Sequence, residues 1–107
     1  MRINLFRLVT ILALLCPGAR AEGDRVVHQK GRMFSETTLV VARGEQVVFL
    51  NDDTVPHNIM STTPDNAFDL GSQMPGSATP VSFDKAGDVA VLCAIHPRMH
   101  LDITVKN

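Results

Sequence analysis

The sequence predicts an all-β protein, a β-sandwich of about seven to eight short strands. Short runs rich in β-branched residues recur along the chain and are separated by turn-forming residues. After residue 21, no segment shows the spacing of apolar residues that an amphipathic helix requires. Because about seven short strands are packed into fewer than 90 residues, two small stacked sheets are the expected architecture.

The first 21 residues have the layout of a cleaved secretory signal peptide. Two arginines precede an apolar run over residues 8–15, and a small-x-small cleavage site follows at residues 19–21. The run is shorter than the roughly 20 residues that a membrane span needs, which argues against a retained anchor helix. We therefore expect residues 1–21 to be removed and residues 22–107 to form one domain, without a membrane span, in the periplasm.

The expected mature chain is acidic and has one cysteine. Loss of three arginines with the signal leaves seven of the ten basic residues against eleven acidic ones, a net charge of −4. No basic stripe is present, which excludes a nucleic-acid-binding protein. Cys16 leaves with the signal, so Cys93 has no partner for an internal disulfide. A lone thiol in an oxidising compartment is expected to be buried or occupied, and a metal would both occupy it and help to close a small core.

The expected strands follow one another at short intervals, with Gly44 marking the turn between the second and third. They cover residues 25–29, 37–42, 46–51, 57–61, 79–83, 88–93 and 101–105. The polar stretch 62–78 is expected to be mostly loop. Alternation along 88–93 predicts Val89, Val91 and Cys93 on one face. The large core candidates are Phe34, Phe49, Phe68 and Phe83.

Three side chains that bind metals recur at every third position near the end of the chain. Cys93, His96 and Met99 lie in the loop between the last two expected strands, and Pro97 stiffens that loop. The expected fourth donor is His57, at the start of a strand. Two histidines, a cysteine and a weak methionine are the donors of a blue-copper electron-transfer site. Thiolate and thioether favour Cu(I), while imidazole also accommodates Cu(II), so little rearrangement accompanies electron transfer.

Other interpretations of these four residues explain less of their types and spacing. Zinc prefers thiolates, imidazoles and carboxylates, and Met99 suits it poorly. A nucleophilic Cys–His pair would leave Met99 unexplained and would lack a recognisable oxyanion hole. A c-type haem needs two cysteines before the histidine, so it is excluded. Each residue alone is more often structural, as a buried cysteine usually is, but their joint spacing favours a metal loop.

Three segments of the chain resemble the cupredoxins, small blue-copper proteins built on a Greek-key β-sandwich. They are "GEQVVFLNDDTVPHN", "VSFDKAGDVAVLCAIHPRM" and "LDITVKN". The short Cys-x-x-His-Pro-x-Met loop is most similar to that of amicyanin and of plastocyanin-like methylamine utilisation proteins. The resemblance implies one copper ion, cycling between Cu(II) and Cu(I), with His57, Cys93 and His96 as equatorial ligands and Met99 as the axial one. It also implies that Asn58 ties the ligand loops together by hydrogen bonds around the thiolate.

The resemblance further implies a monomeric, non-enzymatic carrier that docks redox proteins on an apolar patch around His96. A c-type cytochrome or a dehydrogenase is the expected kind of partner. The candidates for the patch are Val55, Pro56, Met74, Pro75, Ile95 and Pro97. Both partner and patch are expectations of the resemblance alone.

Three positions depart from the family pattern. Val91 stands where many members carry an aromatic residue, Arg98 where amicyanin has an aromatic one, and Leu101 where glycine is common after the axial methionine. The N-terminal extension of amicyanin is also missing. These departures leave copper ligation intact but put amicyanin's partner, an amine dehydrogenase, in doubt.

The sequence is compatible with three functions. Electron transfer is the leading hypothesis. Copper handling, as a chaperone or resistance protein, would use the same ligands, but the methionines are too scattered to form a Cu(I)-binding run. A plain structural sandwich would bury an inert Cys93. His100 is expected to be an exposed histidine rather than a second copper contact, since alternate residues of a strand face opposite sides, and His28 an ordinary strand residue.

Overall fold

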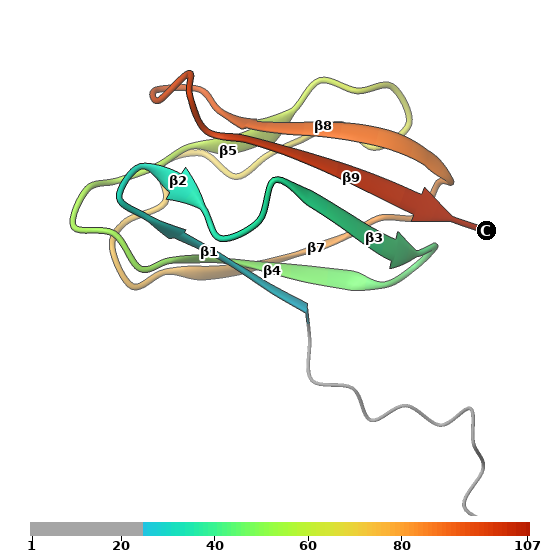
Figure 1. Ribbon diagram of the computed structural model, residues 1–107, viewed down its shortest axis with the longest axis horizontal. Helices are drawn as coiled ribbons and strands as arrows, with labels where there is room; N and C mark the ends of the chain where they lie inside the picture. The colour runs from blue at the N-terminus through green and yellow to red at the C-terminus, as the bar shows by residue number, and fades with distance from the viewer. Residues whose placement is uncertain (1–24) are drawn as a thin grey trace, which may run out of the picture.

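Two β-sheets pack face to face in the computed structural model, which describes residues 25–107 (Figure 1). The predicted signal peptide, residues 1–21, lies outside the described residues. Within residues 25–107, no helix has the length and apolar character needed to cross a bilayer. The all-β sandwich predicted from the sequence is confirmed.

Each sheet combines strands from distant parts of the chain. One sheet has the order β2-β1-β4-β7, and the other has the order β3-β9-β8-β5-β6. The strands of the first sheet are β1 (Arg25–Lys30), β2 (Met33–Phe34), β4 (Gln46–Asn51) and β7 (Ala78–Ser82). Those of the second are β3 (Thr38–Ala42), β5 (Ile59–Ser61), β6 (Phe68–Asp69), β8 (Gly87–Cys93) and β9 (His100–Lys106). The pairs β1–β4 and β3–β9 are parallel and the others antiparallel, so the chain crosses between the sheets in a Greek-key arrangement.

The described residues form nine strands, more than the seven runs found in the sequence. The additional strands, β2 and β6, have two residues each, and β6 lies inside the stretch 62–78 that was expected to be mostly loop. The strand expected over 57–61 begins only at Ile59. His57 instead forms an isolated bridge with Gln73, and the N–H of Asn58 points at a sulfur, so neither residue extends the ladder.

The core lies between the sheets and follows the predicted alternation. Val89, Val91 and Cys93 of β8 are buried, as are alternate residues of β9 and β4. Of the four core phenylalanines expected from the sequence, Phe49 and Phe83 are fully buried, Phe34 is buried with 7% exposed, and Phe68 is half-buried. The Phe49 and Phe68 ring centroids lie 5.9 Å apart. Burying a phenylalanine side chain stabilises a fold by about 1.5–3 kcal/mol, so these rings are a large part of what holds the sheets together.

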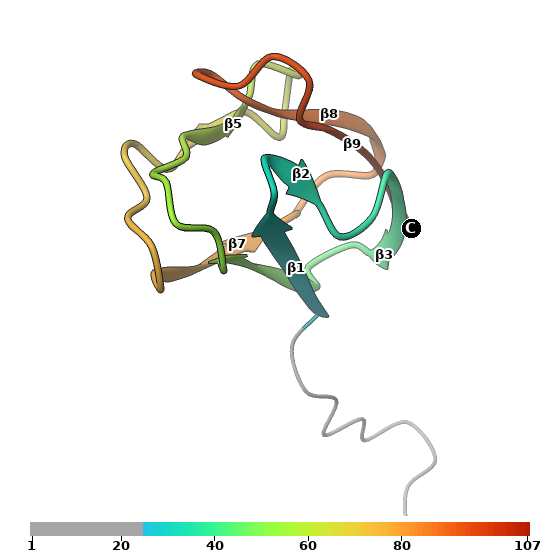
Figure 2. The same cartoon turned by 60° about the vertical axis from the view of Figure 1, so that its left-hand side comes forward.

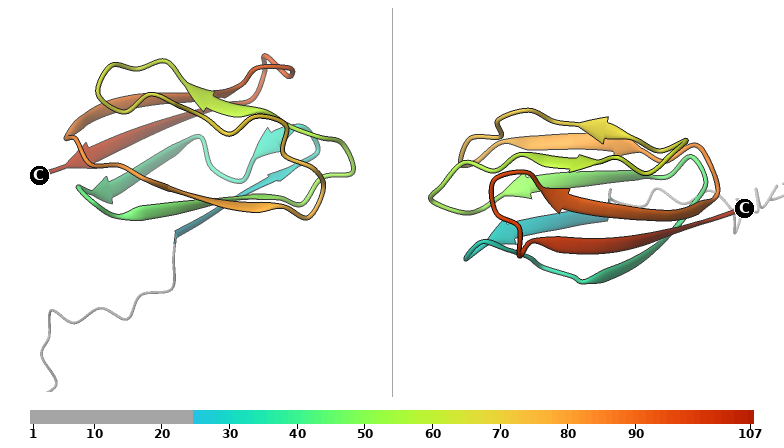
Figure 3. Two further views of the ribbon diagram at one scale, coloured as in Figure 1. Left: turned by 180° about the vertical axis from the view of Figure 1, so that it is seen from behind. Right: turned by 90° about the horizontal axis from the view of Figure 1, so that it is seen from above.

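Four connections gather at one end of the sandwich, which we call the ligand end (Figures 1 and 2). They are the β1–β2 turn and the β4–β5, β6–β7 and β8–β9 loops. The C-terminus and the β3–β4 turn lie at the opposite end (Figures 1 and 3). The sandwich therefore brings residues from four separate stretches of sequence together around His57 and the loop after Cys93.

Candidate metal centre

His57, Cys93 and His96 converge at the ligand end. His57 comes from the β4–β5 connection, Cys93 is the last residue of β8, and His96 lies in the β8–β9 loop. One potential ligand atom from each lies within 4.8 Å of those of the other two. The Cys93 Sγ is 3.8 Å from Nδ1 of His57 and 3.7 Å from Nδ1 of His96, and the two Nδ1 atoms are 3.0 Å apart.

These distances suit one metal ion placed among the three atoms. Metal–nitrogen bonds of about 2.0 Å and a metal–sulfur bond of about 2.3 Å, arranged in a trigonal plane, place nitrogen and sulfur about 3.7 Å apart. Both nitrogen–sulfur distances have this value to within a few tenths of an ångström. The donor set of two imidazoles and one thiolate in a trigonal arrangement is that of a type 1 copper site.

Met99 lies buried at the end of the ligand loop. Its side chain is only 1% exposed, and its N–H donates a hydrogen bond of 3.0 Å to the carbonyl of His96. A tight turn from His96 to Met99 therefore closes the loop that carries the cysteine, histidine and methionine side chains. A soft, buried thioether is the weak axial donor that such copper sites use.

The sulfur of Cys93 accepts a hydrogen bond from the neighbouring backbone. The backbone N–H of Asn58 donates to Sγ over 3.3 Å, and the side-chain amide of Asn58 donates to Asp69 over 2.7 Å. The N–H of Gly71, together with this amide, lowers the pKa of Asp69, which keeps the carboxylate charged as an acceptor. Asn58 therefore contacts the sulfur through its backbone, while its side chain fixes the neighbouring β6–β7 loop.

Asp53 orients the ring of His57, a role that the sequence pattern did not predict. Its Oδ2 lies 3.1 Å from Nε2 of His57 and so accepts the ring N–H there, which leaves the Nδ1 lone pair free for a metal. The N–H of Arg32 and that of Thr54 also donate to Asp53, and with the His57 contact they lower the pKa of its carboxyl group to about 2. The only sequence signal was an acidic residue four positions before the histidine.

A buried amide network holds the backbone around His57. His57 and Gln73 exchange two backbone hydrogen bonds, of 3.0 and 2.7 Å. The side chain of Asn51 donates to the Gln73 carbonyl over 2.8 Å, and that of Gln73 donates to the Phe49 carbonyl over 2.7 Å. Gln29 donates to Gln73 over 2.8 Å, while its own Oε1 has no hydrogen-bond partner. Nothing in the sequence marked the three amides as partners, because they are far apart along the chain.

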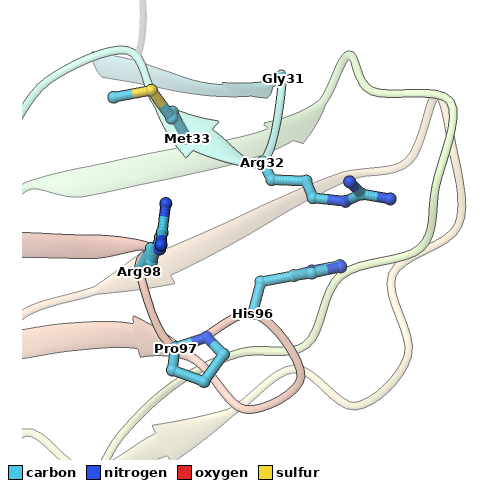
Figure 4. Close-up of a pocket in the computed structure, with 6 residues that line it drawn as sticks. All are labelled: Gly31, Arg32, Met33, His96, Pro97 and Arg98. Carbon is cyan, nitrogen blue, oxygen red and sulfur yellow. The ribbon is translucent and has the colours of Figure 1, made fainter.

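His96 is the half-exposed ligand of the site. It borders a groove of about 550 Å³ that separates the β8–β9 loop from the β1–β2 turn (Figure 4). The other residues that line the groove are Gly31, Arg32, Met33, Pro97 and Arg98. The imidazole thus links the buried ligand atoms to the surface of the protein.

The residues expected to form an apolar patch lie in the loops of the ligand end. Pro56, Met74, Pro75, Ile95 and Pro97 are exposed, and Val55 is half-buried. Met33, which the sequence did not single out, is 62% exposed beside the same groove. Whether partners dock here stays a prediction.

The other two histidines of the described chain lie outside the ligand cluster. His100 is exposed on β9 and bonds Asp102 over 2.8 Å, and His28 is exposed on β1 and bonds Asp52. Val91 and Leu101, which depart from the family pattern, are both fully buried in the core. Arg98, the third departure, is exposed in the ligand loop.

Comparison with known proteins identifies the family. The family model of copper binding proteins of the plastocyanin/azurin family matches residues 22–106. This chain belongs to that family. The expected cofactor is thereby confirmed: this cupredoxin has a type 1 copper site made of His57, Cys93, His96 and Met99.

Solved structures of other cupredoxins share the fold. A Cu(I) amicyanin variant superposes with a TM-score of 0.73 at 24% identity, covering 80% of this chain and 85% of its own. A purple cupredoxin from Nitrosopumilus maritimus gives a TM-score of 0.69 at 24% identity, covering 78% of this chain and 100% of its own. A copper-containing nitrite reductase from Thermus scotoductus gives 0.74 at 24% identity, covering 87% of this chain and 25% of its own. A sequence comparison with curated proteins finds no match.

Proposed function

We propose that this cupredoxin carries single electrons between redox proteins in the periplasm and is not itself an enzyme. The observation that supports the proposal is the asymmetry of the site. Three ligands, His57, Cys93 and Met99, are fully buried, whereas His96 connects them to the surface. A bound copper ion supplies a one-electron couple, and the exposed edge of the His96 ring provides the shortest path for an electron to leave or enter.

The protein's own residues prepare the site for this role. Asp53 and Asn58 hold His57 and the sulfur in place through hydrogen bonds. The surrounding core excludes water, since Met99 and Cys93 are each 1% exposed. Ligands held by packing and outer hydrogen bonds move little when charge changes, which favours fast electron transfer.

Export and partner docking complete the proposal. The signal peptide at residues 1–21 would deliver the chain to the periplasm, where it would act as a monomer. Its redox partners, a c-type cytochrome or a dehydrogenase, would dock near His96, Pro97, Pro56 and Met74. The exposure of these loop residues at the ligand end supports this placement.

The test is to add Cu(II) to residues 22–107 and record the visible spectrum and the voltammogram. We expect an intense thiolate-to-copper band, its loss in Cys93→Ser, and a fast reversible couple. A wild-type protein without the band, or a Cys93→Ser variant that keeps it, would refute the type 1 site. Slow, irreversible voltammetry combined with rapid release of copper to an acceptor would instead favour copper handling.

A further inference from the structure

The β1–β2 turn faces the ligand loop across the groove beside His96. Arg32 stands on one side and Arg98 on the other, with Met33 and Pro97 adding apolar surface (Figure 4). The two sides are separated by more than 60 residues in the sequence. The groove is therefore a product of the fold, and a copper ligand forms part of its wall.

Both arginines present their charge to solvent. They are exposed, and within residues 25–107 neither guanidinium has a hydrogen bond or an ion pair with another side chain. The acidic groups nearby are directed elsewhere, since Asp53 binds His57 and Asp52 binds His28. The groove thus carries two guanidinium groups that have no carboxylate partner among the described residues, on a chain that is acidic as a whole.

The backbone at Arg32 is strained. Lys30 pairs with Met33, so Gly31 and Arg32 are the central residues of a two-residue hairpin turn, with φ of 61° and 56°. Glycine or asparagine is the usual choice for such positions, and arginine is unfavourable there. The N–H of Arg32 donates to Asp53 over 2.8 Å, which fixes the turn to the carboxylate that supports His57. A strained residue held in place beside a site is a reason to look for a function of its side chain.

We propose that an acidic surface of the protein's redox partner docks on this groove and places a carboxylate between Arg32 and Arg98. The inference rests on the proposed electron-transfer function and specifies the partner. Guanidinium groups bind carboxylates through paired hydrogen bonds. The exposed apolar side chains of Met33, which lines the groove, and of Ile95, which precedes His96 in the loop, suit a protein surface rather than a free small anion. Docking there brings the partner against the edge of His96.

The experiment measures electron transfer from the copper-loaded, reduced protein to two c-type cytochromes, one acidic and one basic around the haem edge. Stopped-flow rates are recorded at low and high salt. We expect the acidic cytochrome to react faster and its rate to fall as salt is added. Arg32→Asn and Arg98→Gln should each lower that rate by about 3- to 10-fold at low salt, because complementary charge mainly raises association rates.

Two features make the variants interpretable. Asparagine tolerates the left-handed turn, so Arg32→Asn should fold at least as well as the wild type and keep its visible spectrum. Arg43→Gln removes an exposed charge at the opposite end of the sandwich and should leave the rate unchanged. A loss confined to the two groove variants would support the proposal.

Three outcomes would overturn it. Equal, salt-independent rates with both cytochromes would mean that charge does not select the partner. Rates with hexacyanoferrate that depend on the two arginines, together with cytochrome rates that do not, would mark a small-anion site. If neither cytochrome is reduced and no reversible couple is seen at an electrode, the electron-transfer function itself fails, and the docking proposal with it.

Discussion

The two histidine ligands have very different surroundings. His57 is 0% exposed, its backbone N–H and C=O both bond the backbone of Gln73, and its ring bonds Asp53. His96 is half-exposed, and its Nδ1 lies against the ligand atoms of His57 and Cys93. The fold thus fixes one ligand rigidly inside the protein and leaves the other at the surface. Under the proposed function the difference separates two tasks: His57 would hold the copper from inside the protein, and His96 would provide the contact with redox partners.

The test with the largest expected effect compares the two histidines by removing each ring in turn. His96→Gly opens a gap at the surface that added imidazole can enter, so the intense visible band should return with imidazole. His57→Gly leaves a gap covered by protein, so imidazole should restore little or none of the band. Absorption spectra of the two variants during an imidazole titration make the comparison. Equal rescue of both would show that His57 is as accessible as His96.

The support behind His57 can be tested at Gln73. Gln73→Leu deprives the Phe49 carbonyl and the Gln29 amide of partners inside the core. Each buried polar group left without a partner costs about 1–3 kcal/mol, so with two such groups unfolding should require about 2–6 kcal/mol less. Chemical denaturation of the apoprotein measures the free energy of unfolding.

Gln29→Leu is the matched control for Gln73→Leu. It leaves the Oε1 of Gln73 without its donor, but it also removes the Oε1 of Gln29, which already has no partner, so the two changes largely offset each other. We expect a loss of about 1 kcal/mol or less. A larger loss in Gln29→Leu than in Gln73→Leu would contradict the network described here.

Asp53→Asn tests how the carboxylate behind His57 affects the reduction potential of the copper. The carboxylate places negative charge next to His57, which favours Cu(II) over Cu(I). Its removal should raise the reduction potential by tens of millivolts, or about 1 kcal/mol for one electron. Asp52→Asn is the control, because Asp52 is exposed and bonds His28 rather than a ligand. Voltammetry of both variants tests the prediction, and a potential that falls or does not change in Asp53→Asn would contradict it.

The smallest expected effect is a pH dependence of the apoprotein. Backbone N–H donors lower the pKa of Asp53 to about 2, and the Gly71 N–H together with the Asn58 amide lowers the pKa of Asp69. Because both carboxyls have lower pKa values folded than unfolded, their stabilisation is complete above about pH 4 and is lost as the pH falls toward 2. Asp53→Asn should therefore show a weaker decline of stability between pH 4 and pH 2 than the wild type. An unchanged decline would contradict a contribution from Asp53.

The sequence alone predicted the donor residues of the metal site and the metal that they bind. The donors Cys93, His96 and Met99 lie within one short loop, and their chemical softness points to copper without any knowledge of the fold. Alternation along β8 also placed Cys93 on the same face as Val89 and Val91, which the structure confirms. Such features depend on neighbours a few residues apart, which a pattern in the sequence can reveal.

The supporting residues were not predicted. Gln29 meets Gln73 across 44 positions, and the stretch that contains Gln73 has the composition of an ordinary loop. Arg32 reaches Asp53 across 21 positions, and only the parallel pairing of β1 with β4 brings them together. The strand at His57 was placed too early, since the partners of His57 and Asn58 are Gln73 and the sulfur of Cys93.

What the sequence by itself determined is therefore the chemistry: an all-β chain with a copper-binding donor set. Side-chain type and strand alternation are local properties, and they suffice for that. What only the tertiary structure decided is the environment of each donor: the carboxylate on His57, the N–H on Cys93, the buried amides, and the placement of Arg32 beside His96. These depend on which strands lie side by side, and that is settled by the packing of the whole sandwich rather than by any one segment.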